Sequence, residues 1–435
     1  MSGVWERFVG AVYSTLMRIL TPAILLRYWM RGRSEPIYRH AVAERLGRYA
    51  GPAQPGAIWV HAVSLGETRA AAALIDALRR HRPGMRLLLT HGTATGREAG
   101  VALLHDGDAQ AWLPLDTPGA VRRFLGHFRP TVGVLMETEI WPNLIHTARF
   151  NGIALVLANA RLSERSLHKG ERFAALLKPA LRGLDLVLAQ TEDDSGRFKA
   201  GGATRVVVAG NLKFDMTPNA EQLARGRAWR EAVGRKVVLA ASTREGEEAP
   251  LLEAWLALVA PRPLLLIVPR HPQRFDEVAE LIGASGLAFE RRSRWVDVPP
   301  AASHAVDIWL GDSIGEMATY YATAHVALLG GSFAPLGGQN LIEAAACGCP
   351  VVLGPHTFNF SDAAERALSA GAAIRVQDIR CGVNRAVALA AAEELSDRSA
   401  RAQLFAAEHR GAALHMSAAI TQLANRSAHA TAVTP

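Results

Sequence analysis

Four side chains that follow short apolar runs in the first half of the chain have the types needed for acid, base and cation roles. Glu67 follows Gly66 at a predicted strand-to-helix turn, where helix amides stabilise a carboxylate in the ionised form that a general base needs. A plain helix-capping role for Glu67 stays open. Glu137 and Glu139 bracket the end of a second run, and Lys213 follows a third. If these runs are parallel strands, we expect the four groups to converge on one wall of a cleft.

A glycine-rich stretch at residues 330–355 is the most informative part of the second half. Glycines let backbone amides approach a ligand closely, and a helix predicted to begin near Asn340 would point its positive end at a phosphate. Glu343, in the first turn of that helix, could accept hydrogen bonds from a ribose or act only as a partner of the helix dipole. Ser242, Thr243 and Arg244, after the first apolar run of this half, could bind phosphate.

Two further turns of the second half could contact a nucleotide. Arg270, in the sequence VPRHP, ends an apolar run and is placed to meet a phosphate or a base, although a surface arginine is an equally simple interpretation. The turn from Gly311 to Glu316 offers backbone amides and the carboxylates of Asp312 and Glu316, and Asp312 is also an ordinary helix N-cap residue.

Other polar residues indicate structure rather than chemistry. His61 lies inside an apolar run and is expected to be a core histidine with satisfied hydrogen bonds. Asp106 and Asp108 form a DxD pattern, but their place in a loop after a helix predicts a solvated turn. The sequence contains no GxGxxG, no Walker A lysine, no HExxH and no metal-spaced His/Cys cluster. We therefore expect no bound metal and no cofactor.

The elements that must position these residues alternate between short apolar runs and helical segments. Such runs are typical of parallel strands buried on both faces, with functional residues at their carboxyl ends. The pattern predicts an α/β protein with two Rossmann-like, doubly wound domains that face a cleft, the default ligand site. The predicted parts are a membrane-anchor helix (1–33), an acceptor and base domain (34–216), a linker (217–235), a nucleotide-binding domain (236–395), C-terminal helices (396–425) and a disordered tail (426–435).

The N-terminal segment at residues 8–30 is mostly apolar but is interrupted by Arg18 and Arg27 and contains Pro22. On a helix its polar and apolar residues separate to opposite sides, which predicts an amphipathic helix in the headgroup region or an imperfect span. Arginines at its exit favour a cytoplasmic location for the two domains. A soluble helix packed on a neighbouring domain is the alternative interpretation.

Composition limits the partners. The chain has 435 residues, a formal net charge of +8 and 49% hydrophobic residues, so we expect a globular protein with an anionic partner. The three cysteines are too few for a disulfide framework and fit a reducing compartment.

Nine motifs in order, from SLGE near residue 64 to GPHTFNF at residue 354, resemble the 3-deoxy-D-manno-octulosonic acid (Kdo) transferase family of lipopolysaccharide synthesis. The others are METEIWPNLI, ANARLS, GNLKFD, ASTREGEE, VPRHPQRF, GDSIGEM and GGSFAPLGGQNLIEAA. The resemblance implies a GT-B glycosyltransferase that moves Kdo from CMP-β-Kdo to the lipid A precursor at the cytoplasmic face of the inner membrane, with membrane lipid but no nucleic acid as a partner. The stretches HGTATG and SFAPLGGQN depart slightly from the family pattern, which could alter substrate preference.

The same resemblance implies a role for each matching residue. It makes Glu67 the proton acceptor and Glu137 and Lys213 stabilisers of the transition state. It assigns the CMP site to Pro269, Arg270, Ile314, Gly315, Glu316, Asn340, Leu341, Ile342 and Glu343. Direct attack on the β-configured donor would invert the anomeric carbon. Cationic side chains and helix amides could stabilise the departing CMP without a metal.

Two alternatives to this function remain at the level of the sequence. One is a GT-B enzyme that uses a UDP- or GDP-sugar, and the other is a non-catalytic membrane scaffold that keeps a nucleotide pocket. A nicotinamide-dependent oxidoreductase is disfavoured because SLGE does not supply the glycine-rich fingerprint after the first strand.

Overall fold

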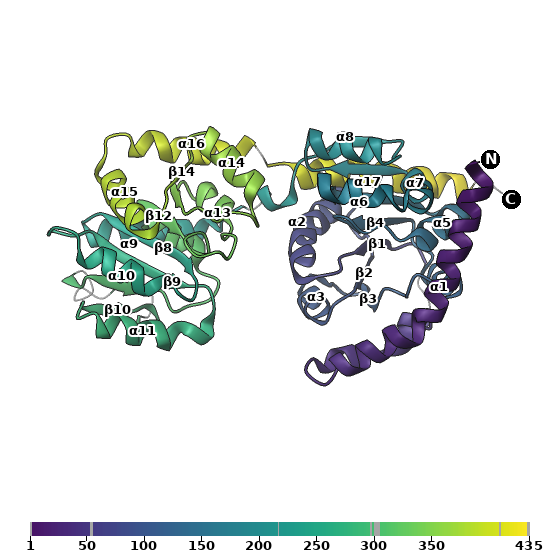
Figure 1. Ribbon diagram of the computed structural model, residues 1–435, viewed down its shortest axis with the longest axis horizontal. Coiled ribbons are helices and arrows are strands. Elements are labelled where there is room, and N and C mark those ends of the chain that lie inside the picture. The colour runs from purple at the N-terminus through teal and green to yellow at the C-terminus, as the bar shows by residue number, and fades with distance from the viewer. Residues whose placement is uncertain are drawn as a thin grey trace. The chain divides into compact units, whose positions relative to one another are not determined.

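The computed structural model describes residues 2–52, 55–215, 217–295, 298–299, 305–408 and 410–432, with the backbone alone for residues 2 and 427–432. They form two compact units (Figure 1). Unit 1 comprises Met1–Asp215 and Arg410–Pro435, and unit 2 comprises Met216–His409. Each unit contains one seven-stranded sheet in which all paired strands are parallel. The two predicted doubly wound domains are therefore present.

The sheet of unit 1 has the strand order β3-β2-β1-β4-β5-β6-β7. Its strands are β1 (Ile58–His61), β2 (Leu87–His91), β3 (Ala109–Trp112), β4 (Val132–Met136), β5 (Ala154–Ala160), β6 (Leu186–Ala189) and β7 (Val206–Val208). Every residue of β1, β2, β4, β5 and β6 is buried, because helices cover both faces of the sheet. This double burial explains why the strands read as continuous apolar runs rather than as alternating patterns.

Helices α2 and α17 cover one face of this sheet, and α4, α5, α7 and α8 cover the other. The α-helices of unit 1 are α1 (Ser2–Arg31), α2 (Leu65–His81), α3 (Ala94–Gly100), α4 (Pro118–Phe128), α5 (Pro142–Phe150), α6 (Glu164–Glu171), α7 (Ala174–Arg182), α8 (Glu192–Ala200) and α17 (Ala412–Ala432). The 3₁₀ turns among the described residues of unit 1 are η1 (Pro36–Arg39), η2 (Val42–Leu46), η3 (Val101–Leu103) and η4 (Leu212–Phe214).

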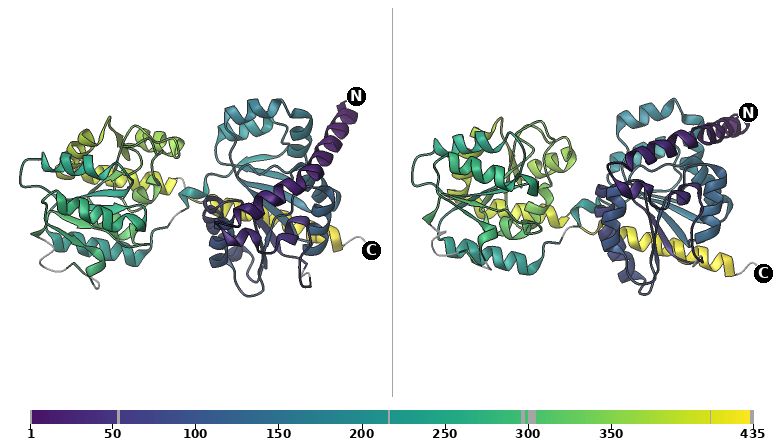
Figure 2. Two further views of the ribbon diagram at one scale, coloured as in Figure 1. Left: turned by 60° about the horizontal axis from the view of Figure 1, so that its bottom comes forward. Right: turned by 90° about the horizontal axis from the view of Figure 1, so that it is seen from below.

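The sequence predicted that the C-terminal helices form a separate part, but the structure divides them between the two units. Helix α16 (Leu395–Glu408) belongs to unit 2, whereas α17 returns to unit 1 and packs against α2, β4 and β5, as the yellow helix in Figure 2 shows. Met416, Ile420 and Ala424 of α17 are fully buried in the core of unit 1. The predicted tail at 426–435 is helical through Ala432, and residues 433–435 lie outside the described residues.

Helix α1 lies against unit 1, next to α5 and α7. The Tyr13 hydroxyl donates to Asp116 Oδ2 at 2.9 Å, and the Ser14 hydroxyl donates to Asn143 Oδ1 at 2.7 Å. Near the C-terminal end of α1, the Tyr28 ring faces the guanidinium of Arg45, whose Cζ lies 3.8 Å from the ring centroid. Polar and aromatic contacts thus hold one side of the helix along its length, as the packed-helix alternative expected.

The opposite side of α1 is largely apolar and uncovered. Its exposed side chains include Val4, Trp5, Phe8, Val12, Leu16, Ile19, Leu20, Leu26, Trp29 and Met30. Among the described residues, one helix, Gly3–Arg31, is long and apolar enough to cross a membrane, with a mean hydropathy of 1.6. Arg7, Arg18 and Arg27 are exposed on the same helix, so its uncovered surface is largely but not wholly apolar.

The sheet of unit 2 has the order β10-β11-β9-β8-β12-β13-β14. Its strands are β8 (Val237–Thr243), β9 (Leu264–Pro269), β10 (Phe289–Arg291), β11 (Ile308–Leu310), β12 (Val326–Leu329), β13 (Val351–Leu353) and β14 (Ala373–Arg375). Besides α16, the helices of unit 2 are α9 (Ala220–Val233), α10 (Glu248–Leu256), α11 (Phe275–Ala284), α12 (Met317–Thr323), α13 (Leu341–Ala346), α14 (Ser361–Ser369) and α15 (Ile379–Ala391). Its 3₁₀ turns among the described residues are η5 (Pro272–Arg274) and η6 (Arg292–Arg294).

The segment predicted as a linker, 217–235, instead contains α9, which is part of unit 2 and packs on α12. Trp229 of α9 is 1% exposed and makes an edge contact with Trp295. Gly226 permits the close approach, because a Cβ there would lie 2.3 Å from the Thr319 carbonyl oxygen. The polar composition that suggested a linker belongs to the outer side of a packed helix.

Replacing Gly226 with Ala should destabilise unit 2. The added methyl group would collide with backbone that cannot easily shift, so we expect a loss of about 1–3 kcal/mol in the free energy of unfolding. Gly126→Ala in the exposed last turn of α4 is the matched control, because nothing lies within 4 Å of its Cβ and alanine should stabilise that helix by up to about 1 kcal/mol. Urea denaturation measures both, and equal values for the two variants would contradict the packing.

Candidate functional site

The functional residues of unit 1 gather where the direction of chain winding reverses. From β1 the chain moves outward to β2 and β3, then returns to β4 on the other side of β1. In such sheets the loops that leave the two central strands diverge and open a crevice at their carboxyl ends. Glu67 follows β1, and Glu137 and Glu139 follow β4, so all three carboxylates border this crevice.

Glu67 forms a capping box at the start of α2. The Val63 amide donates to Glu67 Oε2 at 2.8 Å, the Ser64 hydroxyl donates to Oε1 at 3.0 Å, and the Glu67 amide donates to Ser64 Oγ at 3.4 Å. The capping interpretation is therefore correct, but each carboxylate oxygen keeps acceptor capacity. Burial raises the pKa of Glu67 despite these hydrogen bonds, and the charge of Glu137 adds to the rise. The sequence predicted that helix amides would stabilise the ionised form of Glu67, but the net effect of its surroundings is to raise its pKa.

Glu139 has the most perturbed carboxyl of this group. Burial first, and then the negative charges of Glu67 and Glu137, raise the pKa of Glu139 to about 7. Glu137 has a left-handed backbone with φ of 58°, which is strained for a residue with a side chain. The Glu139 carboxyl therefore titrates near neutral pH, next to the carboxyl of Glu67.

A chain of side-chain amides fixes the turn that carries Lys213. Asn159 lies at the end of β5, and its Oδ1 accepts from the Leu212 amide at 3.1 Å. Its backbone carbonyl accepts from Gln190 Nε2 at 2.9 Å. Gln190 in turn accepts from Asn211 Nδ2 at 2.9 Å, and Asn211 Oδ1 accepts from the Lys213 amide at 2.9 Å. Three adjacent strands, β5 to β7, thereby place Lys213 at the same edge of the sheet as the carboxylates.

Unit 2 has the corresponding reversal between β8 and β12. The two strand ends touch closely, because a Cβ at Gly330 would lie 2.3 Å from the Ser242 carbonyl oxygen, and Ser242 has φ of 55°. The Arg270 amide donates to the Thr243 carbonyl at 2.9 Å. The structure therefore brings Ser242, Thr243 and Pro269 together with the glycine-rich stretch.

Glu247 organises this edge, although the sequence did not single it out. Its buried carboxylate accepts from the amides of Arg244 at 2.9 Å, Gly331 at 2.8 Å, Phe333 at 3.1 Å and Ala334 at 3.2 Å. One side chain after β8 thus shapes the loop after β12. Its position in the motif ASTREGEE was visible, but nothing in the spacing showed which backbone it would bind.

Positive charge concentrates at the ends of β8 and β9. Burial, followed by the charges of Arg244, Arg270 and Arg274, lowers the pKa of His271. Arg274 pairs with the buried Glu248 at 2.6 Å, whereas Arg270 donates to Gln339 Oε1 at 3.1 Å at the exposed edge. This edge is suited to an anionic ligand.

The predicted nucleotide residues of α13 contribute mainly through the backbone. Asn340 caps the helix, with Oδ1 accepting from the Ile342 amide at 3.1 Å, and the side chains of Leu341 and Ile342 are 1% exposed. Burial raises the pKa of Glu343 while the charge of Arg270 opposes the rise. The charges of Glu343 and Arg270 therefore interact at this edge of the sheet. The ribose and helix-dipole interpretations of Glu343 both remain.

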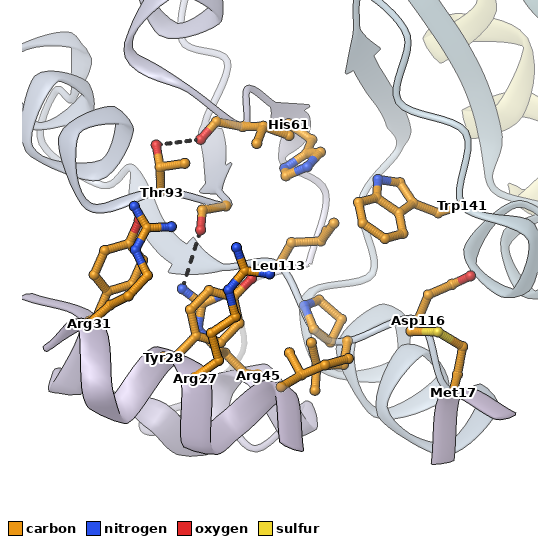
Figure 3. Close-up of a pocket in the computed structure, with 16 residues that line it drawn as sticks. Met17, Arg27, Tyr28, Arg31, Arg45, His61, Thr93, Leu113, Asp116 and Trp141 are labelled. Carbon is orange, nitrogen blue, oxygen red and sulfur yellow. Dashed lines mark hydrogen bonds between the residues drawn. The ribbon is translucent and has the colours of Figure 1, made fainter. Parts of the chain in front are cut away.

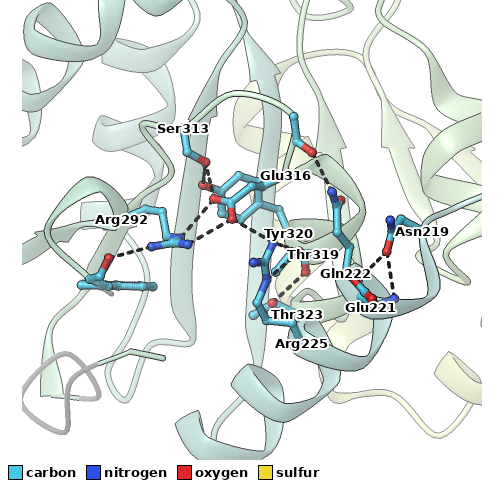
Figure 4. A network of polar contacts seen from close by, with 12 residues as sticks. Asn219, Glu221, Gln222, Arg225, Arg292, Ser313, Glu316, Thr319, Tyr320 and Thr323 are labelled. Carbon is cyan, nitrogen blue, oxygen red and sulfur yellow. Dashed lines mark hydrogen bonds and ion pairs between the residues drawn. The ribbon is translucent and has the colours of Figure 1, made fainter. Parts of the chain in front are cut away.

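The turn at Ile314, Gly315 and Glu316 is held by an ion-pair network (Figure 4). Arg292 binds Glu316 with two hydrogen bonds of 3.1 and 3.0 Å, and Arg225 of α9 pairs with the same carboxylate at 2.8 Å. Burial alone would raise the pKa of Glu316, but hydrogen bonds from Ser313 and Arg292 outweigh it and the pKa is lowered. The Glu316 carboxylate is thus bound by protein side chains. Ile314, 77% exposed, forms the outer part of the turn.

Within the described residues, no group of three His, Cys, Asp or Glu side chains has an arrangement that could hold a metal ion. Asp108 of the DxD pattern accepts from Arg79 at 2.5 Å and from the Leu87 amide at 2.7 Å. These contacts make it a structural residue of the sheet edge.

Comparisons with known proteins agree on one family. The family model described as 3-deoxy-D-manno-octulosonic-acid transferase (kdotransferase) matches residues 40–216. A 3-deoxy-D-manno-octulosonic acid transferase of Bordetella pertussis is 48% identical over 418 residues, covering 92% of this chain and 96% of that protein. The protein of the same name from Haemophilus influenzae is 35% identical over 394 residues, covering 88% and 90%.

Solved structures with low identity share the fold. A glycosyltransferase of kitacinnamycin is 16% identical with a TM-score of 0.52, covering 85% of this chain and 99% of that chain. UDP-GlcNAc 2-epimerase from Neisseria meningitidis is 15% identical with a TM-score of 0.52, covering 85% and 99%. The two-sheet architecture is therefore that of GT-B glycosyltransferases and related epimerases, and the fold alone does not choose among their reactions.

Removing the Glu247 carboxylate should destabilise the glycine-rich loop. Glu247→Ala leaves four backbone amides without their acceptor, so we expect a loss of at least about 3 kcal/mol in the free energy of unfolding. Glu245→Ala, at an exposed neighbouring position, should change it by less than about 0.5 kcal/mol. Chemical denaturation compares the two, and a Glu247 variant as stable as the Glu245 variant would contradict this role.

Proposed function

Because the chain belongs to the 3-deoxy-D-manno-octulosonic acid transferase family, we propose that it transfers Kdo from CMP-β-Kdo to the lipid A precursor in lipopolysaccharide assembly. The observation that carries the chemistry is the cluster of three carboxylates at the β1/β4 reversal of unit 1. A sugar hydroxyl is a weak nucleophile, so a base within hydrogen-bond reach must remove its proton.

In this proposal, Glu67 is the base. Its capping contacts hold the carboxylate in one orientation, and its raised pKa makes it a stronger base than an exposed glutamate. The neighbouring Glu139, with a pKa near neutral, can accept or share the proton within the cluster. Glu137 borders the same crevice and Lys213 follows β7 at the same edge of the sheet, and both would stabilise the charges that develop during transfer.

Unit 2 holds the donor in the same scheme. The guanidinium of Arg270 and the α13 residues from Asn340 to Glu343 would bind CMP, beside the loop that Glu247 holds in place. Departing CMP gains negative charge, which suits the arginine-rich ends of β8 and β9. These cations support a reaction that uses no metal and no cofactor. Direct displacement from the β-configured donor predicts inversion at the anomeric carbon.

We assign the protein to the cytoplasmic face of the inner membrane. The uncovered apolar side of α1 would lie in the membrane surface while its polar side stays paired with unit 1. The formal charge of +8 favours attachment to anionic lipid. This placement brings unit 1 to an acceptor that is itself a membrane lipid.

Incubation of the purified chain with CMP-Kdo and tetra-acylated lipid A precursor tests the function directly. Mass spectrometry should show one or more Kdo increments on the acceptor. Competition by CMP, UMP and GMP separates this donor from a UDP- or GDP-sugar. A chain that binds CMP but forms no product under these conditions would support the non-catalytic scaffold instead.

Glu67→Gln should abolish most of the transfer. Glutamine preserves the capping box but cannot accept a proton, so we expect kcat to fall by roughly 10²–10⁴-fold with an unchanged affinity for CMP. The control is Glu98→Gln, the same change at an exposed position of α3. Steady-state kinetics with both variants give the answer, and near-normal transfer by Glu67→Gln would exclude it as the base.

Glu137→Gln should shift the acidic limb of the pH-rate profile to lower pH. The charge of Glu137 contributes to the raised pKa of Glu67, so a neutral amide in its place lowers the pKa of Glu67 and keeps the base ionised in more acidic solution. A profile of kcat/KM from pH 5 to 9 measures the shift, and a shift to higher pH would contradict the coupling.

A further inference from the structure

The turn between β11 and α12, residues Ser313 to Glu316, lies at the carboxyl edge of the unit 2 sheet. Strand β11 pairs with β9, which ends at Pro269 on the same edge. Ile314 is 77% exposed, and Gly315 has φ of 81°. Among the described residues, no hydrogen bond engages the backbone amides of Ile314, Gly315 and Glu316. The turn therefore presents backbone donors at the edge where doubly wound sheets bind their ligands.

Gln222 of α9 fixes the direction of one peptide in this turn. Its Nε2 donates to the Gly315 carbonyl oxygen at 2.9 Å (Figure 4). In a trans peptide the carbonyl and the N–H that follows it point in opposite directions, so the Glu316 amide is directed away from α9. Glycine takes the left-handed conformation at residue 315 without strain. A side chain of α9 thus decides which way a donor of the turn points.

Arg225, one turn further along the same helix, sets the charge beside the turn. Its guanidinium pairs with the Glu316 carboxylate at 2.8 Å, and Arg292 pairs with the same carboxylate at 3.0 Å. The preceding carboxylate, Asp312, is paired with Arg291 at 2.6 Å. One carboxylate and two guanidiniums leave the Glu316 group with one net positive charge. Without Arg225 the same group would be neutral and would attract a nucleotide phosphate less strongly.

The helix that carries these two side chains is fixed against α12. Arg225 donates to Thr319 Oγ1 at 3.1 Å. The Thr323 hydroxyl donates to the Gly226 carbonyl at 3.2 Å, and Arg230 Nε donates to the Thr323 carbonyl at 3.1 Å. These contacts join α9 to α12 along the length of α12. Because α9 does not move independently of α12, it holds the turn that precedes α12 in one conformation.

We propose that Gln222 and Arg225 are positioning residues for the donor nucleotide. They hold the turn so that its backbone amides donate to acceptor atoms of the nucleotide, and Arg225 offsets the Glu316 charge that would otherwise repel the phosphate. The identity of the nucleotide as CMP rests on the proposed function. The segment that the sequence predicted as a linker therefore supports the donor site.

Calorimetric titration of the full chain with CMP tests both residues without any catalysis. Arg225→Gln should weaken CMP binding about tenfold and Gln222→Met about threefold, the effects of losing an ion pair and one neutral hydrogen bond. Arg227→Gln, the same change at an exposed position of α9, is the matched control and should bind CMP normally. Thermal denaturation checks that each variant is folded.

A double variant separates the charge of Arg225 from its packing. Arg225→Gln combined with Glu316→Gln removes one positive and one negative group, so the net charge of the Glu316 group returns to its native value. The double variant should bind CMP more tightly than Arg225→Gln alone. With cytidine, which has no phosphate, Arg225→Gln should change the affinity less than with CMP. No recovery in the double variant, or an equal loss for both ligands, would overturn the charge role.

Steady-state kinetics distinguish positioning from a general loss of structure. The Gln222 and Arg225 variants should raise the KM for CMP-Kdo severalfold while kcat and the KM for the acceptor stay nearly unchanged. A variant that only destabilises unit 2 would instead lower kcat by reducing the amount of active protein, and it would leave the donor KM unchanged. That second pattern would contradict the proposal.

The outcomes also separate this inference from the proposed function. Absence of Kdo transfer by the unmodified chain would defeat the proposed function, while the CMP titrations would still decide the roles of Gln222 and Arg225. Unchanged CMP affinity in folded Gln222→Met and Arg225→Gln, or an equal loss in Arg227→Gln, would overturn the inference. An unmodified chain that does not bind CMP would overturn it as well.

Discussion

The reversal of winding in each parallel sheet is the constraint on which the rest of this protein depends. Loops that leave β1 and β4, or β8 and β12, must run in opposite directions, because their crossovers lie on opposite sides of the sheet. The space that opens between them is lined by backbone amides and strand-end side chains. In unit 1 this space holds carboxylates, and in unit 2 it holds arginines and a glycine-rich loop. The same backbone geometry therefore positions negative groups in one unit and positive groups in the other.

Two carboxylates show how such a crevice is kept in shape. Glu67 binds the amide and hydroxyl of the turn before its own helix, and Glu247 binds four amides of two different loops. A buried carboxylate without partners is costly, and backbone amides offset that cost while becoming fixed themselves. The two carboxylates differ in their other neighbours. Glu67 faces other carboxylates in the crevice, whereas Glu247 is surrounded by backbone donors.

Helix α1 combines two roles that sequence alone presents as alternatives. Its Tyr13, Ser14 and Tyr28 attach it to unit 1, while its opposite side stays apolar and uncovered. The packed side of the helix also lines a cavity of unit 1 (Figure 3), with Met17 and Tyr28 among its lining residues. His61 lines this cavity from β1, and its buried Nε2 has no hydrogen-bond partner among the described residues, so the expectation of satisfied hydrogen bonds is wrong for this atom. One helix thus has an exposed, largely apolar side and a side that packs on the domain.

By itself the sequence determined the two parallel sheets and the strand ends that carry Glu67, Glu137 and Arg270, because central strands buried on both faces must be apolar runs. It did not reveal β3, β10 and β14, which are edge strands with less burial and weaker patterns. Only the tertiary structure decided the raised pKa of Glu139, the commitment of Glu316 to two arginines, the four amides on Glu247 and the return of α17 to unit 1. These properties arise from burial and from contacts between residues far apart in the chain, which local spacing does not encode.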